Sequence, residues 1–529
     1  MRQPAGTPGA SASSNLAWSV YRNAEERPDA IALNVEGRTL TYSELRVSAQ
    51  QVAGWLLART SNGPVGRVAI FARRSLETYL GILGACWAGG TYVPINPTLP
   101  EARLAQMLEA VEPEAIVVDR RHLPLLTARL RAAAPVLAPC FTPVSGGESA
   151  ADGEALPPYD PRDVPRPVPP EHVGYIVFTS GTTGVPKGVV VPVRAVAAFV
   201  EAVRALFVVG PEDRTAGMSE ITFDISVFDM FFTWDRGAAL YVVPAAQAMA
   251  PLSYLREQSI TVLFGVPSLL RVLARMKLLH PGALPELRVS IFAGEPLPVA
   301  LAESWSSAAP GSLVENFYGP TEAAVSCSRQ RFEPGGPNPS ARGIVSIGHP
   351  LPGTRLLVMG GDRRALPPGQ AGELAIAGVQ LALGYHRDAE RTAQKFVRLD
   401  GERWYLTGDQ AMTDADGRLF FLGRLDNQVK VRGHRVELEE VEAHLRAISG
   451  VEAVAVVAWP VRDGSADGLV AFLAGELDDR VAGLRNALRA RLPPHMVPAA
   501  IHIVDALPLT ANGKVDRKAL QAGLEPPPA

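Results

Sequence analysis

A run of small, hydroxylated and glycine residues with a single lysine, TSGTTGVPKG at residues 179–188, has the groups needed to hold phosphate. It follows an apolar strand pattern, GYIVF. At such a turn, backbone N–H groups, hydroxyls and an ammonium can together surround phosphate oxygens. The spacing is not that of a Walker A loop, because Pro186 stands where a glycine is required and Lys187 precedes Gly188 instead of Ser or Thr. We therefore expect a phosphate-binding loop of another type.

Other familiar catalytic patterns are missing from the sequence. No GxGxxG follows a strand, and no GxSxG or HExxH occurs, which weighs against a dinucleotide enzyme, a serine hydrolase and a zinc protease. The cysteines Cys86, Cys140 and Cys327 lie far apart and form no CxxC pair, so neither a disulfide framework nor a cysteine zinc site is expected. A reducing, cytoplasmic location fits this cysteine usage.

The composition favours small-molecule chemistry. The 529 residues are 47% hydrophobic and 20% charged, which is an ordinary globular composition. With 51 Lys and Arg against 54 Asp and Glu, the formal charge is −3, and no basic block indicates binding to nucleic acid or to an anionic membrane. We find no stretch that predicts an export signal or a membrane span.

The elements that must position the phosphate loop follow an alternating pattern. Short Val- and Ile-rich runs such as VAIFA, AIVVD, YIVFT, VLFGV and VSIFAG alternate with helical patterns, which predicts an α/β fold. Residues 1–14 are predicted to be a flexible tail, and residues 142–170 an exposed connection. From Asp426 the charge density rises and an amphipathic helix follows, so we expect an N-terminal core at 15–425 and a small α+β domain at 426–529.

Further motifs stand in order along nearly the whole chain: LTYSEL at 40–45, AGGTYVPIN at 88–96, NFYGPTE at 316–322, GEL at 372–374 with GY at 384–385, YLTGD at 405–409, GRLDNQVKVRG at 423–433, LPPHMVP at 492–498 and NGK at 512–514. With the phosphate loop, this series resembles the adenylate-forming superfamily, which includes acyl-CoA synthetases, luciferases and the amino-acid adenylation domains of nonribosomal peptide synthetases. Two details depart from the family pattern. Asn96 stands where an aspartate is usual, and residues 191–194 lack a histidine that often follows the loop.

The resemblance implies a large α/β domain with a small mobile C-terminal domain, and ATP and Mg²⁺ as cofactors. It implies that ATP is bound by Thr179, Ser180, Gly181, Thr182, Thr183, Gly184, Lys187, Gly294, Glu295, Asn316, Phe317, Tyr318, Gly319, Asp409, Phe421 and Arg424. Lys514, Glu322 and Thr321 would be catalytic, with Glu322 holding the metal and Asp426 serving as the hinge. The strand from Lys430 to Gly433 would reach the active site once the small domain rotates.

The motif FDIS at 223–226 helps to choose among the branches of the family. By resemblance to amino-acid adenylation domains, Asp224 holds the substrate α-ammonium, a pair that a fatty or aryl acid could not form. The substrate pocket implied by the resemblance consists of Asp224, Ile225, Phe228, Phe264, Ile291, Ala293, Phe317, Val325, Ser326 and Lys514. This apolar lining disfavours charged side chains. It is most similar to prolyl-adenylating enzymes, so L-proline is expected, with small branched aliphatics such as valine close behind.

The same motifs also indicate a partner and leave alternative functions open. No carrier domain is recognised after Lys514, so we expect a free-standing enzyme that loads a separate phosphopantetheinylated peptidyl carrier protein. An acyl-CoA ligase and a nucleotide-binding protein without catalysis remain alternatives. Asp224 argues against the ligase. The presence of Lys187, Glu322, Asp409 and Lys514 argues against a non-catalytic protein.

Overall fold

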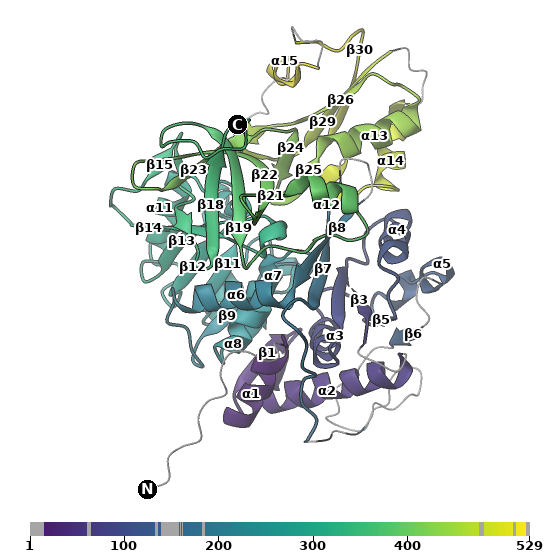
Figure 1. Cartoon of the computed structure of the whole chain (residues 1–529), viewed down its shortest axis with the longest axis vertical. Coiled ribbons are helices and arrows are strands. Elements are labelled where there is room, and N and C mark those ends of the chain that lie inside the picture. Colours follow the sequence, from purple (N-terminus) through teal and green to yellow (C-terminus); the bar gives the residue numbers. More distant parts are fainter. Residues whose placement is uncertain are drawn as a thin grey trace.

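The computed structural model describes residues 15–60, 65–132, 136–138, 158, 160, 162–181, 186–475, 481–510 and 515–524. The predicted tail 1–14, much of the connection 142–170, and Thr182, Thr183, Gly184 and Lys514 lie outside the described residues. The α/β class is confirmed: layered sheets and helices form a large N-terminal part, and a smaller lobe follows it (Figure 1).

The phosphate-loop sheet has the strand order β20-β8-β7-β4-β3-β5-β6. Its strands are β3 (Arg67–Phe71), β4 (Thr91–Ile95), β5 (Ala115–Val118), β6 (Val136–Ala138), β7 (Val173–Thr179), β8 (Lys187–Pro192) and β20 (Gly384–Tyr385). The helices of this part are α2 (Tyr42–Arg59), α3 (Leu76–Trp87), α4 (Glu101–Val111) and α5 (Ala128–Arg131). Strands β7 and β8 are antiparallel neighbours, with Thr179 opposite Lys187. The predicted loop therefore connects two strands of one hairpin.

The second sheet has the order β17-β14-β13-β12-β11-β9-β10-β1-β2. Its strands are β1 (Ile31–Val35), β2 (Arg38–Thr41), β9 (Arg214–Gly217), β10 (Ala239–Val242), β11 (Val262–Gly265), β12 (Val289–Phe292), β13 (Leu313–Tyr318), β14 (Ser328–Phe332) and β17 (His349–Pro350). Its helical segments are α1 (Trp18–Glu26), α6 (Val193–Arg204), α7 (Ile225–Val227), the π-helix Phe228–Phe232, α8 (Thr233–Asp235), α9 (Leu252–Glu257), α10 (Pro267–Arg275) and α11 (Val299–Ala308). The strands from β1 to β13 in this order run parallel, so β9, β11, β12 and β13 end at one edge.

A third, antiparallel sheet has the order β18-β19-β22-β21, and β23 pairs with β22. Its strands are β18 (Thr354–Met359), β19 (Gly372–Gly378), β21 (Phe396–Leu399), β22 (Glu402–Thr413) and β23 (Leu419–Arg424), with α12 (Ala389–Lys395) before β21. The short strands β15 (Ser340–Ala341) and β16 (Ile344–Val345) pair with each other.

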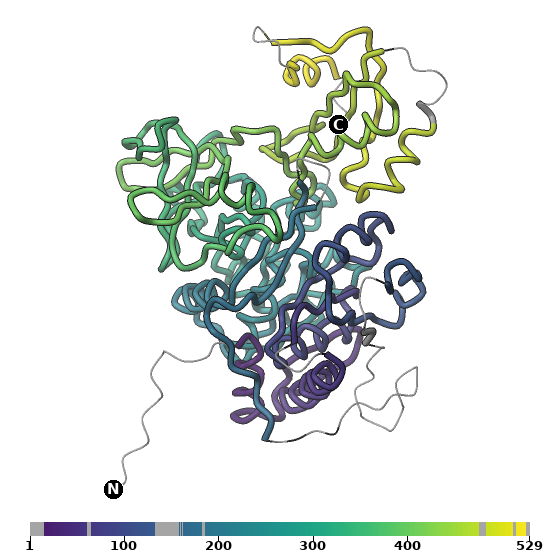
Figure 2. Tube along the Cα trace, turned by 45° about the vertical axis from the view of Figure 1, so that its right-hand side comes forward, coloured from purple at the N-terminus to yellow at the C-terminus, as the bar shows by residue number. Residues whose placement is uncertain are grey.

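The residues after β23 form a lobe that we call the lid, residues 428–524, with the gaps given above (Figures 1 and 2). Its strands are β24 (Gln428–Val431), β25 (His434–Glu437), β26 (Val454–Ala458), β27 (Val461–Arg462), β28 (Ser465–Ala466), β29 (Leu469–Ala474) and β30 (Ala500–Val504). Its helices are α13 (Leu438–Ser449), α14 (Val481–Arg489) and α15 (Arg517–Ala522). The lid has its own buried apolar cluster, which includes Val436, Val441, Leu445, Val456 and Leu473.

An ion-pair cluster ties the first two sheets together near the carboxyl ends of β3 and β9. Arg73 and Arg74 follow β3, and both donate to Glu220, which follows β9. Arg74 also donates to the carbonyl of Val243 at 2.8 Å. The segment that carries Asp224 begins beside this cluster, so its position is fixed from both sheets. No helix in the part of the chain that the structure describes is long and apolar enough to cross a membrane.

Candidate active site

A cavity of about 840 Å³ lies where the carboxyl ends of the strands meet the third sheet and the lid. Many of the predicted residues line it: Thr179, Ser180, Asp224, Ile225, Ala293, Gly294, Glu295, Asn316, Phe317, Tyr318, Gly319, Thr321, Val325, Asp409, Phe421 and Arg424. Buried behind this lining are Lys187, Phe228, Phe264, Ile291, Glu322 and Ser326. The structure thus gathers residues that are far apart in the sequence around one site.

At the phosphate end, Glu322 is a fully buried carboxylate surrounded by donors. The Tyr385 hydroxyl donates to its Oε1 at 2.8 Å, and Arg435 Nη1 donates to its Oε2 at 3.0 Å. Lys187 Nζ lies 3.8 Å from Glu322 Oε1 and 3.8 Å from Glu437 Oε1. Burial raises the pKa of Glu322, but Arg435 and Lys187 outweigh it and hold the pKa well below its usual range. The carboxylate is therefore ionised.

The pKa of the loop lysine is also lowered, but here burial is the largest cause. Burial and the neighbouring Arg435 lower the pKa of Lys187 to about 8, against the opposing charges of Glu322 and Glu437. Nearby, the Thr179 hydroxyl is buried and has no hydrogen-bond partner among the described residues. A buried polar atom without a partner costs free energy unless a ligand satisfies it. An ammonium group and an unsatisfied hydroxyl beside a glycine-rich turn can both donate hydrogen bonds to phosphate oxygens.

At the nucleoside end, two rings and a carboxylate stand together. Tyr318 and Phe421 have ring centroids 6.5 Å apart and planes inclined by 35°. The Tyr318 hydroxyl donates to Asp409, and Arg424 Nη1 donates to the other Asp409 oxygen at 2.7 Å. Asn316 Nδ2 donates to the backbone carbonyls of residues 345 and 346, so its side-chain oxygen can act as a hydrogen-bond acceptor.

At the substrate end, Asp224 immediately precedes the short helix α7 and is half-buried, with part of its surface in the cavity lining. Its Oδ2 atom is buried and has no hydrogen-bond partner among the described residues. Burial raises the pKa of Asp224 to about 6, although a hydrogen bond from Thr321 and the charge of Lys430 oppose this rise. Such a carboxylate favours a cationic ligand.

Aromatic rings close the floor below Asp224. Phe228 contacts Phe264 edge to face with centroids 5.0 Å apart, and Phe264 contacts Phe317 in the same way at 6.0 Å. Phe228 also stacks on Phe232 at 4.7 Å. Of these rings, Phe317 reaches the cavity, whereas Phe228 and Phe264 pack behind it. The cavity at this end is therefore shallow.

One wall of the substrate end is a strained turn that the sequence did not reveal. Ala324 and Val325 both have left-handed backbone, with φ of 50° and 72°. For non-glycine residues this conformation costs roughly 1–3 kcal/mol each unless the surroundings impose it. Gln380 supplies that support, because its Nε2 donates to the carbonyl of Ser326 at 2.8 Å and to those of Ala323 and Ala324 at 3.3 Å.

The lid hairpin β24–β25 enters the cavity in this structure. Lys430, Gly433, His434 and Arg435 all line it. Gly433 has φ +83°, so any other residue would be strained there, although a Cβ atom would make only an ordinary contact of 3.6 Å with the Val266 side chain. Burial lowers the pKa of Lys430, and the neighbouring Arg435 adds to this effect. The strand that the resemblance assigns to the second half-reaction therefore lines the cavity in this structure.

A histidine pair lies beside the hairpin. His434 stacks on His495 with centroids 3.8 Å apart, and its edge contacts Phe223 at 5.0 Å. Burial and Lys430 lower the pKa of His434 to about 4, and burial and His434 lower that of His495 to about 3. Both rings are therefore neutral at neutral pH, as close stacking requires.

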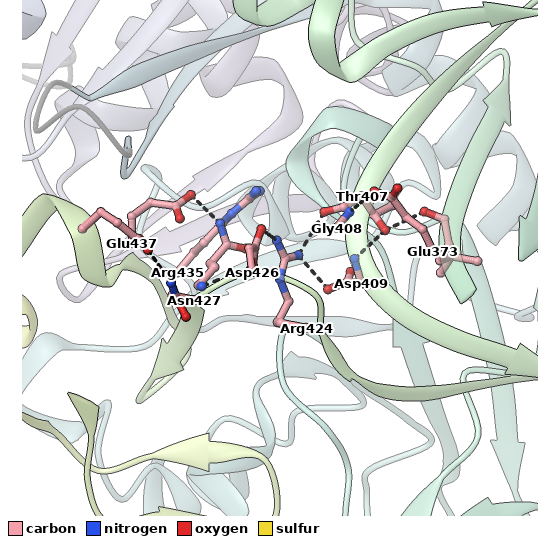
Figure 3. Close-up of polar contacts among 12 residues, drawn as sticks. Glu373, Thr407, Gly408, Asp409, Arg424, Asp426, Asn427, Arg435 and Glu437 are labelled. Atoms are coloured by element: carbon pink, nitrogen blue, oxygen red, sulfur yellow. Dashed lines mark hydrogen bonds and ion pairs between the residues drawn. The ribbon is translucent and has the colours of Figure 1, made fainter. Parts of the chain in front are cut away.

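The predicted hinge, Asp426, lies between β23 and β24 and is held by an ion pair. Arg424 Nε donates to Asp426 Oδ1 at 2.8 Å, and the Gln428 backbone N–H donates to the same oxygen at 3.2 Å. The same Arg424 side chain binds Asp409, so the hinge and the nucleoside end share one guanidinium (Figure 3). Glu295, which the resemblance assigns to ATP binding, lines the cavity, and its carboxylate oxygens accept hydrogen bonds from the Ser268 N–H, Arg271 and the lid residue Ser465.

Comparisons with known proteins place the chain in a family. The model described as "AMP-binding enzyme" matches residues 20–386, and that described as "AMP-binding enzyme C-terminal domain" matches residues 440–514. The chain therefore belongs to the AMP-binding enzyme family. It is an adenylate-forming ligase, which uses ATP.

Among curated relatives, the chain is 34% identical over 502 residues to tyrocidine synthase 3 of Brevibacillus parabrevis, covering 94% of this chain and 7% of that protein. It is 34% identical over 504 residues to the dimodular nonribosomal peptide synthase of Bacillus subtilis strain 168, covering 94% of this chain and 20% of that protein. The chain thus spans a fifth or less of the length of these relatives.

Solved structures extend the likeness to the whole chain. The Vibrio cholerae adenylation domain AlmE, in complex with glycyl-adenosine-5'-phosphate, matches with a TM-score of 0.86 and 28% identity over 98% of this chain and 99% of that chain. IdnL7 matches with a TM-score of 0.70 and 33% identity, covering 96% of this chain and 98% of that chain.

Proposed function

We propose that the protein activates an α-amino acid with ATP to give an aminoacyl adenylate and pyrophosphate, then transfers the acyl group to the phosphopantetheine thiol of a carrier protein. The observation that carries the proposal is Asp224, a half-buried carboxylate whose buried Oδ2 has no hydrogen-bond partner among the described residues, in a cavity that Thr179 and Ser180 of the phosphate loop also line. A substrate α-ammonium supplies the missing cation. The likeness to AlmE, crystallised with a glycyl adenylate, supports an amino acid as substrate.

Our proposed amino acid is L-proline. Phe228, Phe264 and Phe317 restrict the depth of the site, which disfavours large aromatic side chains. Apart from Asp224, Ser326 and Lys514, the residues of the predicted substrate pocket are apolar, so a charged side chain would lose its hydration without a partner. Valine or another small branched aliphatic is the second candidate, because one methylene more or less in such a pocket changes binding by only about 1–3 kcal/mol.

In the first half-reaction, an oxygen of the amino-acid carboxylate attacks the α-phosphorus of ATP and the bond to pyrophosphate breaks. Lys187 and the loop N–H groups are proposed to bind the leaving phosphates, and Asp409 the ribose hydroxyls. Tyr318 and Phe421 are placed to enclose adenine. Lys514, from its motif, is proposed to bridge the carboxylate and the phosphate oxygens during the attack. The enzyme thus acts by positioning and by electrostatic stabilisation.

Magnesium is proposed to bind at Glu322. Buried carboxylate oxygens suit this ion, which takes one or two carboxylates and completes its shell with phosphate oxygens and water. Within the described ranges no group of three or more His, Cys, Asp or Glu could hold a metal by itself. When bound, the ion would neutralise the developing phosphate charge.

In the second half-reaction, the thiol attacks the acyl carbonyl carbon, its proton is lost, and AMP leaves. The proposed hinge at Asp426 allows residues 426–529 to move as a unit, so that Lys514 serves the first step and the Lys430–Gly433 strand the second. The position of that strand in the cavity supports this division of work.

The test is amino-acid-dependent ATP–pyrophosphate exchange over a panel of proline, valine, glycine, lysine and tryptophan. We expect proline to give the highest rate. A maximum with lysine or tryptophan contradicts the pocket assignment, and no exchange with any amino acid contradicts the proposed reaction. A second assay compares acyl transfer to a phosphopantetheinylated carrier with transfer to free coenzyme A. Efficient transfer to coenzyme A and none to carriers would favour the acyl-CoA ligase alternative.

A further inference from the structure

The connection between β19 and β20, residues 379–383, is held in place by two arginines from other elements. They donate to four of its backbone carbonyls: Arg403 on β22 to those of residues 382 and 383, at 2.6 and 2.7 Å, and Arg194 on α6 to those of residues 379 and 381. The backbone from which the Gln380 side chain extends is therefore fixed on both sides of that residue.

The Gln380 side chain reaches from this connection to the turn between β13 and β14. It is 1% exposed, and its Nε2 donates to the backbone carbonyls of residues 323, 324 and 326 at 2.8–3.3 Å. Its Oε1 is buried and has no hydrogen-bond partner among the described residues. The amide therefore serves the turn as a hydrogen-bond donor, and a side chain without an N–H group could not replace it.

The turn needs this support because its backbone conformation is unfavourable by itself. Ala324 and Val325 lie in the left-handed region, which residues other than glycine occupy only when their surroundings impose it. Without the hydrogen bonds from Gln380, both residues would relax toward ordinary backbone angles. The Val325 side chain and its N–H group would then move as well.

Val325 connects this turn to the substrate end of the cavity. Its side chain lines the cavity. Its backbone N–H forms a hydrogen bond with Asp224, which opposes the rise that burial causes in the pKa of that carboxyl. A shift of the turn would therefore move an apolar wall and at the same time withdraw a donor from the carboxylate proposed to bind the ammonium.

Glu322, which precedes the turn, is held independently of the Gln380 side chain. The Tyr385 hydroxyl donates to its carboxylate at 2.8 Å, and the Ala382 backbone N–H donates to its carbonyl at 2.9 Å. The phosphate end of the cavity should therefore keep its geometry when the Gln380 amide is removed.

We propose that Gln380 is a positioning residue for the amino-acid substrate: by holding the turn at Ala324 and Val325, it sets the size of side chain that the site accepts and the affinity for the α-amino acid. The inference rests on the proposed function, which assigns this end of the cavity to the amino acid. Gln380 itself does not line the cavity and lies outside the predicted substrate pocket.

The first test is Gln380→Met, which removes the donor but keeps a side chain of similar length. We expect the KM for the preferred amino acid in ATP–pyrophosphate exchange to rise by about tenfold, since the support of a strained residue is lost. Its preference in kcat/KM over larger apolar amino acids should fall, and the KM for ATP should change much less.

Gln50→Met is the matched control for the loss of a buried amide. Gln50 lies on α2, is 4% exposed, and exchanges hydrogen bonds with the backbone N–H and carbonyl of Asp160, outside the cavity lining. We expect this variant to be less stable in urea unfolding, with neither KM nor the order of preferred amino acids changed.

A rescue variant separates positioning from general stability. Glycine adopts positive φ without steric cost, so Ala324→Gly should let the turn keep its conformation without the amide. We expect the double variant Gln380→Met, Ala324→Gly to recover most of the lost affinity and selectivity. If Gln380 served only general stability, the glycine would recover neither.

Two outcomes overturn the inference while the proposed function stands: equal changes in the KM values for ATP and for the amino acid, or no recovery in the double variant. If Gln380→Met does not fold, Gln380→Asn, with a donor on a shorter side chain, takes its place, and unchanged selectivity in that variant overturns the inference as well. If the wild-type protein exchanges with no amino acid, the proposed function and the inference both fail.

Discussion

Asp224 can bind an ammonium only while it is ionised, and its surroundings set the pKa of its carboxyl. Burial raises its pKa to about 6. Below that pH the carboxyl is protonated, and the substrate ammonium loses its partner. We therefore expect the KM for the amino acid to rise by about tenfold for each pH unit below 6, while the KM for ATP changes much less. Exchange assays at pH 5 to 8 with each substrate varied in turn measure this.

Asp224→Asn provides the control for this titration. The amide keeps the shape and a hydrogen-bond acceptor but carries no charge at any pH. We expect a high amino-acid KM that does not depend on pH between 5 and 8. A wild-type profile that is flat over the same range would mean that the ammonium is bound elsewhere, and the choice of family branch would then lose its basis.

At the scale of elements, the aromatic floor joins three of them: β11 with Phe264, the π-helix with Phe228, and β13 with Phe317. Phe264→Ala should open space beneath Asp224 and shift exchange toward larger amino acids such as leucine or phenylalanine. It should also lower the free energy of unfolding by about 3–5 kcal/mol, as is typical of such truncations. The panel exchange assay and urea unfolding measure the two effects.

Phe292→Ala is the control that shows whether loss of stability alone changes the preferred amino acid. Phe292 lies on the neighbouring strand β12 but belongs to an apolar cluster separate from that of the three floor rings, and its ring centroid lies 5.4 Å from that of Trp305. We expect a comparable loss of stability with no change in the order of preferred amino acids. If both variants broaden the panel equally, general loosening of the core explains the effect, and the floor does not determine specificity.

The order of helices and strands could be predicted from the sequence because hydrophobic periodicity depends on neighbouring residues. Strand pairing and the assembly of the site depend on residues far apart in the chain and could not be predicted. Alternating Val- and Ile-rich runs predicted the α/β class. They could not predict that β1 pairs with β10, about two hundred residues later, or that Gln380 supports the left-handed turn at Ala324 and Val325. The partners of Glu322 on the lid were missed for the same reason. In the sequence, Arg435, Glu437 and Glu440 look like ordinary charged residues of an amphipathic segment. Only the folded structure shows that they lie at the loop.

At the scale of the whole molecule, our proposal is that the hinge at Asp426 determines which half-reaction the lid serves. Asp426→Pro removes the ion pair with Arg424 and fixes φ near −65°. Both changes disfavour the lid position seen here, in which that ion pair and the Gln428 N–H hold Asp426. We expect ATP–pyrophosphate exchange to persist while carrier loading falls. Asp426→Ala removes the ion pair without fixing φ and should reduce loading less.

Lys514→Ala should lose exchange but keep acyl transfer, because the proposed contact of Lys514 is made only in the adenylating state. Loss of one charge-assisted contact in a transition state typically costs about 2.7–4 kcal/mol, so exchange should slow by about 10²–10³-fold. Transfer from supplied acyl adenylate should survive, since that step does not use Lys514. The measurement is a paired assay in which exchange and carrier loading are followed on both variants and on wild type. If Asp426→Pro and Lys514→Ala lose both activities in equal proportion, the two steps do not depend on separate lid positions, and Asp426 is a structural residue of the domain boundary.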